Sequence, residues 1–244
     1  VMRWMYSSQN PEHNLLFGYK QADEVRKDIL TLWNVYSFFI TYANIDQFDP
    51  AKPAPAVPKR PEMDRWILSD LNLLVSDVTN AFERFEPQTA VRKVEMFVES
   101  LSNWYVRRNR RRFWQAGRLD QTNNKGNHDK LAAYATLYEV LLTLSKLLAP
   151  VMPFITETIY QNLTSQRNIG CESVHLDRYP IVNTKIIETQ LTEVMQLAMR
   201  ISSLGRSARS KASIKVRQPL NTAMIKTRTE SEYSLLSQAR PYII

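Results

Sequence analysis

The stretch Leu101-Ser-Asn-Trp-Tyr-Val-Arg-Arg-Asn-Arg-Arg-Arg-Phe-Trp114 sets five arginines among large aromatic residues. Its apolar residues continue a helical spacing that begins at Pro87, and proline suits the first turn of a helix because its missing amide hydrogen costs nothing there. We therefore expect one long helix from Pro87 to about Ala116. On that helix, arginines gather on neighbouring rows with Trp104, while Arg110 and Trp114 form a pair four residues apart.

Other stretches also show apolar residues at steps of three and four, which is the spacing of one helical face. They cover about residues 20–45, 62–85, 129–148 and 184–210, and a shorter helix follows Pro153. Asp129 is suited to cap the helix that it begins, because its carboxylate can accept the free amides of the first turn. The chain has only 5 glycines, whereas all-β proteins use glycine freely in turns. The sequence predicts an all-α fold in which helices form a bundle.

The segments between these helices have their own signals. Five prolines in residues 46–61 predict an extended linker, and polar residues from 117 to 128 predict a loop. Residues 173–176 look extended, and apolar residues alternate with polar ones after Ile214, as in strands. We expect four parts: a first helical segment (1–45), the linker (46–61), a helix bundle (62–212) and the start of a truncated α/β-like unit (213–244).

The positive charge is concentrated in two blocks. The net charge of the chain is +8; residues 99–135 carry 8 basic and 3 acidic side chains, and residues 200–244 carry 9 and 2. Excess charge confined to blocks of a near-neutral chain is typical of a surface that contacts phosphates. Arginine offers a planar fork of donors that fits phosphate oxygens, and aromatic rings stack on unpaired bases.

The candidate nucleic-acid contacts come from both blocks. They are Asn103, Trp104, Arg107, Arg108, Arg110, Arg111, Arg112, Trp114, Arg206, Arg209, Lys211, Lys215 and Arg217. A simpler interpretation exists for some of them. The aromatic residues can be core residues, with the arginines paired to acids on adjacent helices. Cations at a helix C-terminus, such as Arg209 and Lys211, are favoured by the helix dipole alone.

Residues for catalysis or metal binding are not grouped in the sequence. The three histidines lie far apart, none at metal-ligand spacing, and Cys171 is the only cysteine, so we expect no metal site and no intrachain disulfide. Asp64 and Asp70 are most simply explained as part of a solvated helix face. No apolar run approaches the ~20 residues of a membrane helix. Because the chain starts at Val1 without an initiator methionine, we expect it to be a piece of a longer protein.

Several motifs resemble isoleucyl-tRNA synthetases. The motif Asn103-Trp-Tyr-Val-Arg-Arg-Asn-Arg-Arg-Arg-Phe-Trp114 closely resembles a characteristic helix of that family, and Asp64-Arg-Trp-Ile-Leu-Ser-Asp-Leu-Asn72 resembles the preceding helix. Ser173-Val-His-Leu176 and Ile214-Lys-Val-Arg-Gln-Pro-Leu220 also match. Leu148-Ala-Pro-Val-Met-Pro-Phe-Ile-Thr-Glu157 is less specific, because valyl and leucyl relatives share it. The resemblance extends over about residues 1–220.

The resemblance implies a helix bundle of the class Ia synthetase anticodon-binding type, with tRNA(Ile) as partner. The whole enzyme would be a cytoplasmic monomer that attaches isoleucine to tRNA with ATP. The two ATP-binding signatures of the family and its editing domain do not occur in this sequence, so we expect this piece to lack catalytic sites and to hold no cofactor or metal. Two alternatives stay open: the corresponding domain of a valyl enzyme, and a helical protein-interaction module.

Overall fold

A computed structural model describes residues 1–10, 12–14, 17–115, 125–164 and 170–243. The chain divides into two compact units, Val1–Ile187 and Glu188–Ile244. This division falls before the last long helix, whereas we expected the bundle to extend to residue 212. The described residues contain helices and no β-strand, which confirms the all-α prediction.

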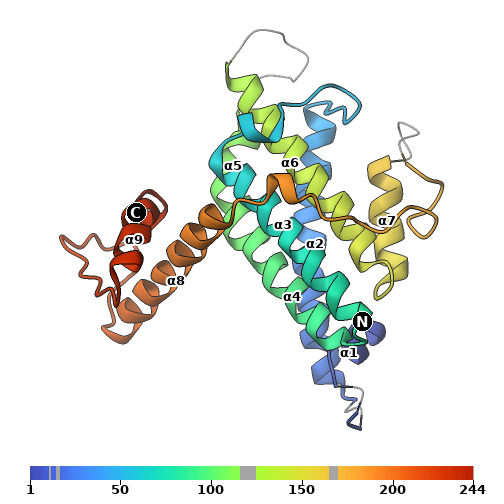
Figure 1. The fold of residues 1–244 in the computed structure, drawn as a ribbon, viewed down its shortest axis with the longest axis horizontal. Coiled ribbons are helices and arrows are strands. Elements are labelled where there is room, and N and C mark those ends of the chain that lie inside the picture. The colour runs from blue at the N-terminus through green and yellow to red at the C-terminus, as the bar shows by residue number, and fades with distance from the viewer. Residues whose placement is uncertain (11, 15–16, 116–124, 165–169, 244) are drawn as a thin grey trace. The chain divides into compact units, whose positions relative to one another are not determined.

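The first unit is a helix bundle (Figure 1). Its α-helices are α1 (Met2–Ser7), α2 (Tyr19–Ile45), α3 (Glu62–Glu83), α4 (Pro87–Ser100), α5 (Arg107–Trp114), α6 (Lys125–Leu148) and α7 (Pro153–Thr164). Short 3-10 helices span Val57–Lys59 and Thr184–Ile186. Within the bundle, α3 packs against α4 and α6, and α6 also packs against α5 and α7.

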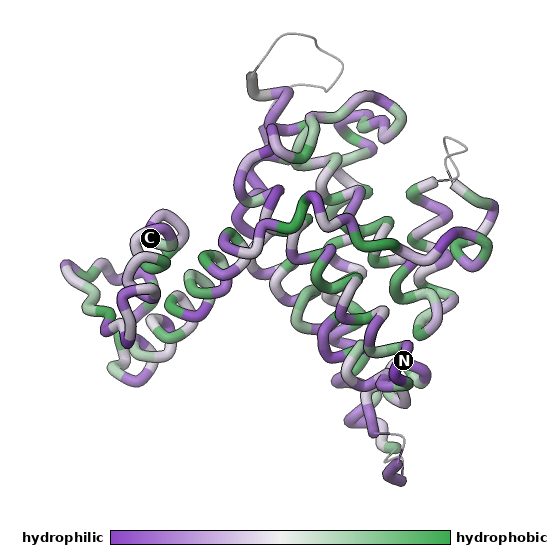
Figure 2. Tube along the Cα trace, in the orientation of Figure 1, coloured by the Kyte–Doolittle hydropathy of each residue, from purple (hydrophilic) through white to green (hydrophobic). Residues whose placement is uncertain are grey.

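The predicted apolar faces of the helices form the core of this unit. Figure 2 shows apolar residues recurring along the helices of the bundle. The buried face of α3 comprises Trp66, Ile67, Leu71, Leu74, Val75 and Val78, and that of α6 comprises Leu137, Val140, Leu141, Leu144, Leu147 and Leu148. Burial of such side chains stabilises a fold by roughly 1.5–3 kcal/mol each before the entropy cost of ordering the chain.

The long helix predicted from Pro87 is continuous to Trp114, but it is not α-helical throughout. A π-helical segment, Leu101–Val106, joins α4 directly to α5. Four of its six residues are buried: Leu101, Trp104, Tyr105 and Val106. A π segment has more residues per turn than an α-helix, so it changes which residues of α5 face the core. Ala116, the expected helix end, lies outside the described residues.

Helix α6 begins earlier than predicted. Its first residue is Lys125, so Asp129 lies inside the helix, and the prediction that Asp129 caps it is wrong. The predicted loop at 117–128 lies mostly outside the described residues, and its last residues belong to α6. The stretch Asn127–Leu148 is long and apolar enough to cross a membrane, contrary to our expectation, but 67% of its apolar window is buried inside the bundle. The core helix of a soluble protein can have the same length and hydropathy, so these two properties are weak evidence for a membrane span.

The proline-rich segment 46–61 is anchored to the bundle. Arg60 is buried; its Nε donates to the Pro55 carbonyl at 2.8 Å, and its Nη2 lies 2.7 Å from Glu139 Oε1 on α6. A third bond joins its Nη1 to Thr136. One arginine therefore fixes the end of this segment just before α3.

The predictions of an extended segment at residues 173–176 and of strands after Ile214 are wrong. Residues 173–176 form turns, which Glu157 of α7 holds by accepting hydrogen bonds from the Val174 amide (2.9 Å) and the Ser173 hydroxyl (3.0 Å). Residues 214–229 contain no strand. Alternation over a few residues is not enough to make a strand, because a strand needs a partner for its backbone hydrogen bonds.

The second unit consists of α8 (Thr189–Lys211) and α9 (Glu230–Ile243) with the connection between them. The two helices pack against each other, and the Gln190 side chain donates to Gln238 Oε1 at 3.2 Å. After α8 the chain turns at Ser213, whose φ is 54°, a backbone conformation that non-glycine residues seldom adopt. The connection from Ser213 to Thr229 contains no strand, and the helix α9 follows it.

Candidate nucleic-acid interface

The inner side of α5 is fixed by its buried residues. Phe113 and Asn109 are buried, and Asn109 Nδ2 donates to the Tyr105 carbonyl one turn earlier at 2.8 Å. Phe113 packs edge-on against Phe38 of α2 and Tyr134 of α6, with ring centroids 5.1 and 4.9 Å apart. These contacts set the rotation of the helix and therefore decide which arginines reach the solvent.

Arg112 is turned inward and is used by the fold. Its Nη1 and Nη2 lie 2.6 and 2.7 Å from the two carboxylate oxygens of Asp64, and Nη2 also lies 2.9 Å from Asp129 Oδ1. The Asp64 side chain is fully buried, and the Arg112 side chain is only 12% exposed. Burial alone would lower the pKa of Arg112, but the hydrogen bond and charge of Asp64 outweigh it and raise that pKa.

This arrangement corrects two expectations. Asp64 is not part of a solvated face, since it also accepts a hydrogen bond of 2.7 Å from the Tyr105 hydroxyl. Burial and the Asp64 charge raise the pKa of Tyr105, so this phenol stays protonated and donates. The guanidinium of Arg112 is committed to carboxylates, so we remove Arg112 from the candidate contacts with nucleic acid.

The other arginines of α5 are exposed. Within the described part of the chain, Arg107, Arg110 and Arg111 have no acidic partner within ion-pair distance. Arg108 is also exposed and lies over the Trp104 ring, 4.6 Å from its centroid. A guanidinium stacked on an aromatic ring keeps its positive charge. Helix α5 therefore presents four cations outward and one inward.

The three other candidates of this region divide between core and surface. Trp104 is buried, so its ring supports Arg108 and is not open for stacking on a base. Trp114, at the end of α5, is 54% exposed. Asn103 is exposed and lies at the edge of a hollow next to acidic residues.

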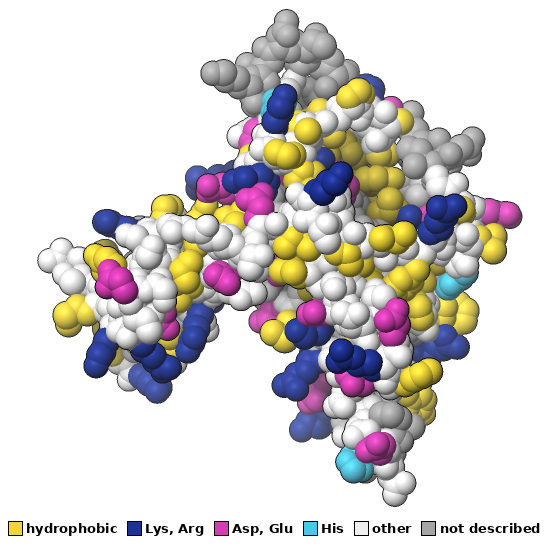
Figure 3. Space-filling view, viewed as in Figure 1, with side chains coloured by type: hydrophobic (Ala, Val, Ile, Leu, Met, Phe, Trp, Pro, Cys, Tyr) yellow, Lys and Arg dark blue, Asp and Glu magenta, His cyan; other side chains and the backbone are white. Residues whose placement is uncertain are grey.

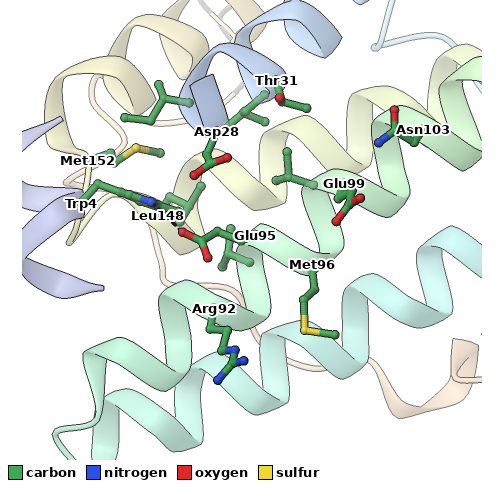
Figure 4. Close-up of a pocket in the computed structure, with 14 residues that line it drawn as sticks. Trp4, Asp28, Thr31, Arg92, Glu95, Met96, Glu99, Asn103, Leu148 and Met152 are labelled. Carbon is green, nitrogen blue, oxygen red and sulfur yellow. Dashed lines mark hydrogen bonds between the residues drawn. The ribbon is translucent and has the colours of Figure 1, made fainter. Parts of the chain in front are cut away.

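That hollow lies among α1, α2, α4 and α6 and has a volume of about 520 Å³ (Figure 4). Asp28, Glu95 and Glu99 line it, and the Trp4 indole nitrogen donates to Glu95 Oε1 at 3.0 Å. Burial, followed by the neighbouring Glu24, raises the pKa of Asp28, and burial also raises that of Glu95. Because these three carboxylates outnumber Arg92, the one arginine in the lining, the hollow does not extend the basic surface of α5.

The second basic block lies in the second unit, where Figure 3 shows Lys and Arg side chains gathered at one edge. Arg206, Lys211, Lys215 and Arg217 are exposed. Arg209 is half-buried, and its Nη1 donates to the carbonyls of Lys215 (3.2 Å) and Gln218 (2.7 Å). Arg209 thus holds the turn that carries Lys215 and Arg217.

Groups suited to metal binding are not found in the part of the chain that the structure describes: no three His, Cys, Asp or Glu side chains come together there. Cys171 is exposed, and His175 contacts the Pro153 carbonyl through Nε2 at 3.2 Å. The site that stands out in the described residues is the basic surface of α5.

Fold and surface together define an all-α domain with a basic helix exposed on it. Residues 64–224 match the family described as "Anticodon-binding domain of tRNA ligase", and the chain belongs to that family. Three relatives are named isoleucine–tRNA ligase: those of Dehalococcoides mccartyi strain 195 (50% identical over 90% of this chain), Clostridium acetobutylicum (44% over 95%) and Thermus thermophilus (43% over 95%). The chain spans about a fifth of their length, 21%, 22% and 22% respectively. None of these three is a valyl enzyme.

Proposed function

We propose that this chain is the tRNA-binding part of an isoleucine–tRNA ligase and grips the anticodon stem and loop of tRNA(Ile). The observation that carries the proposal is the contrast on α5 between Arg112, which is ion-paired with Asp64 inside the bundle, and Arg107, Arg110 and Arg111, which are exposed without an acidic partner among the described residues. Arg108 is also exposed. Exposed guanidinium groups within five residues of helix, just over one turn, suit the closely spaced phosphates of folded RNA. Asn103 and Trp114 flank these cations.

The second basic group, Arg206, Lys211, Lys215 and Arg217, is proposed as a further set of phosphate contacts, with Arg209 as the residue that holds its turn. The whole protein would attach isoleucine to tRNA with ATP bound elsewhere than in this chain. We also propose that it is a cytoplasmic monomer; the single exposed cysteine suits a reducing compartment.

The test is the salt dependence of tRNA(Ile) binding by the 244-residue chain. Replacing Arg107, Arg110 and Arg111 by alanine should weaken binding and reduce the slope of log K against log salt by about 2–3, because each phosphate contact contributes ~0.7–0.9. The matched control is Lys20→Ala with Arg26→Ala and Lys27→Ala on α2, which removes the same charge from exposed positions.

The control variant should retain the slope of the unmodified chain. If both triple variants lose binding equally, net charge rather than the α5 surface controls binding, and the proposed interface is wrong. A helical protein-interaction module, the other function considered from the sequence, would bind tRNA weakly in every variant. Circular dichroism establishes that the variants keep their helices.

A further inference from the structure

The aromatic residues around the arginines have different environments. Trp104 and Phe113 are buried, whereas Trp114 is 54% exposed. The other tryptophans of the chain, Trp4, Trp33 and Trp66, are buried or partly buried. An indole ring exposes a large apolar face, so a tryptophan with half its surface in water marks a place where a flat apolar partner can bind.

A second ring lies beside Trp114, although it comes from a distant part of the sequence. Tyr42 of α2 lies with its ring centroid 6.5 Å from that of Trp114, at an interplanar angle of 50°. Tyr42 is partly exposed. The two rings therefore form an angled pair at the surface, one from α2 and one from the end of α5.

This pair is supported from the core by further rings. Tyr42 contacts Phe38 at 4.9 Å between centroids, and Phe38 contacts the buried Phe113 at 5.1 Å. Phe113 precedes Trp114 directly in the chain. Because the inner rings are packed, the outer pair is held in place before any partner binds, which lowers the entropy cost of binding.

Cations lie next to the exposed ring. Arg110 and Arg111 precede Trp114 by four and three residues, which places them on the adjoining turn of the same side of α5, and both are exposed. A flat apolar face beside two guanidinium groups matches the two parts of a nucleotide, which are a planar base and a charged phosphate. Phe154, an exposed aromatic residue of α7, has no ring contact among the described residues and no arginine within four positions of it.

We propose that Trp114 and Tyr42 form a stacking site for one unpaired nucleobase, with Arg110 and Arg111 contacting its flanking phosphates. The site rests on the proposed function, since it lies beside the tRNA-binding arginines, and it adds a residue, Tyr42, that the arginine motif does not contain. The site takes a base by its face rather than its edge, so it selects single-stranded over duplex RNA and discriminates little among bases.

The experiment compares a short single-stranded RNA with a duplex RNA of matched phosphate number. Trp114→Ala should weaken binding of the single strand by about 5- to 150-fold, the range expected for one stacked base, and should leave binding of the duplex unchanged. Trp114→Phe should retain most of the affinity because phenylalanine keeps a ring face. Phe154→Ala is the matched control and should bind both RNAs as the unmodified chain does.

Tryptophan fluorescence tests the site even if the Trp114→Ala variant does not fold. The single-stranded RNA should quench the emission of the unmodified chain, because the most exposed indole becomes covered, and the quench should disappear in Trp114→Phe while binding persists. Tyr42→Ala should reduce both the quench and the affinity.

Two outcomes would overturn the stacking site: absence of quenching in the unmodified chain when the RNA is bound, or full single-strand affinity in Trp114→Ala. If either occurs while the Arg107, Arg110 and Arg111 variant still loses tRNA binding, the stacking site is wrong and the proposed function stands. If that arginine variant also binds normally, the proposed function itself fails.

Discussion

Arg112 and Asp64 face each other through two parallel hydrogen bonds, with Nη1 2.6 Å from Oδ1 and Nη2 2.7 Å from Oδ2. The pair joins α5 to α3 across 48 residues of sequence, and Asp129 extends it to α6. A bidentate pair between an arginine and a carboxylate fixes orientation as well as distance. It therefore locks the rotation of α5 and keeps the neighbouring arginines directed outward.

Replacing Asp64 by asparagine should destabilise the fold by about 3 kcal/mol. The change leaves the mostly buried Arg112 charge with Asp129, which is 37% exposed, as its remaining acidic partner, and a broken buried ion pair is costly. Urea denaturation measures the loss. Asp23→Asn is the control, because the Asp23–Arg26 pair is exposed and worth at most about 1 kcal/mol. Equal losses in the two variants would contradict the structural role of Asp64.

The same Asp64→Asn variant should bind tRNA more weakly or equally well, although it adds one positive charge. If Arg112 were an RNA contact that Asp64 partly neutralises, the variant would bind more tightly and with a steeper salt dependence. Because Arg112 is held between the carboxylates of Asp64 and Asp129, we expect it to position α5 rather than to contact RNA. Salt-dependent binding of tRNA(Ile) separates the two cases by the sign of the change.

Lys130→Met should cost about 3 kcal/mol, and adding Asp46→Asn should recover part of that loss. Lys130 is buried, with Nζ 2.7 Å from Asp46 Oδ2 and 2.9 Å from the Gln115 carbonyl. The single variant leaves the Asp46 carboxylate buried without its cation, whereas the double variant removes that charge as well. Thermal or urea unfolding of the two variants measures the difference. Lys93→Met, at a pair about half exposed on each side, should change stability by less than about 1 kcal/mol.

The buried charged residues Asp64 and Lys130 each lie on an apolar helix face that can be recognised in the sequence. Asp64 precedes Ile67, Leu68 and Leu71 at helical spacing, and Lys130 precedes Tyr134, Leu137 and Leu141 in the same way. A charged residue on an apolar stripe signals a buried ion pair, and this signal could have corrected our expectation for Asp64. The partner could not be found this way, because Asp64 and Arg112 meet only through the packing of α3 and α5.

The apolar spacing predicted the helices well because one 3.6-residue period covers each of them. It could not separate Arg111 from Arg112, which are neighbours in sequence and opposite in environment. That distinction depends on the π-helical segment Leu101–Val106, whose effect on rotation has no clear sequence signal. The sequence therefore predicts a cluster of exposed arginines, but only the structure shows which arginines belong to it.

Asp70→Asn should make the chain more stable at pH 7 and leave its stability unchanged near pH 4. Burial, followed by the charge of Asp77, raises the pKa of Asp70 from 3.8 to about 6, against the opposing effect of Lys93. The folded chain thus holds this proton more tightly than the unfolded chain, and stability falls as pH rises from about 4 to about 6. We expect a gain of about 1–2 kcal/mol at pH 7, since partial exposure reduces the full effect.

Urea denaturation of this variant and its parent at several pH values tests the prediction. Glu83→Gln removes an exposed carboxylate from the same helix and is the matched control. A gain in Asp70→Asn that is constant from pH 4 to pH 7 would contradict a raised pKa, because a packing effect does not titrate.

Arg209→Ala should loosen the turn after α8 without unfolding the helix. Its guanidinium donates to the carbonyls of Lys215 and Gln218, and each bond to a charged donor near the surface is worth about 1 kcal/mol. Loss of both bonds should make the turn open about 30-fold more often. Trypsin reports this opening directly, because Lys215 and Arg217 are cleavage sites within the turn. Arg206→Ala removes the same charge from an exposed side chain and serves as the control. When the turn opens and closes faster than trypsin cleaves it, the cleavage rate follows the fraction of open turn. Trypsin should therefore cut the turn faster in Arg209→Ala than in Arg206→Ala. Equal cleavage rates in the two variants would mean that Arg209 does not hold the turn.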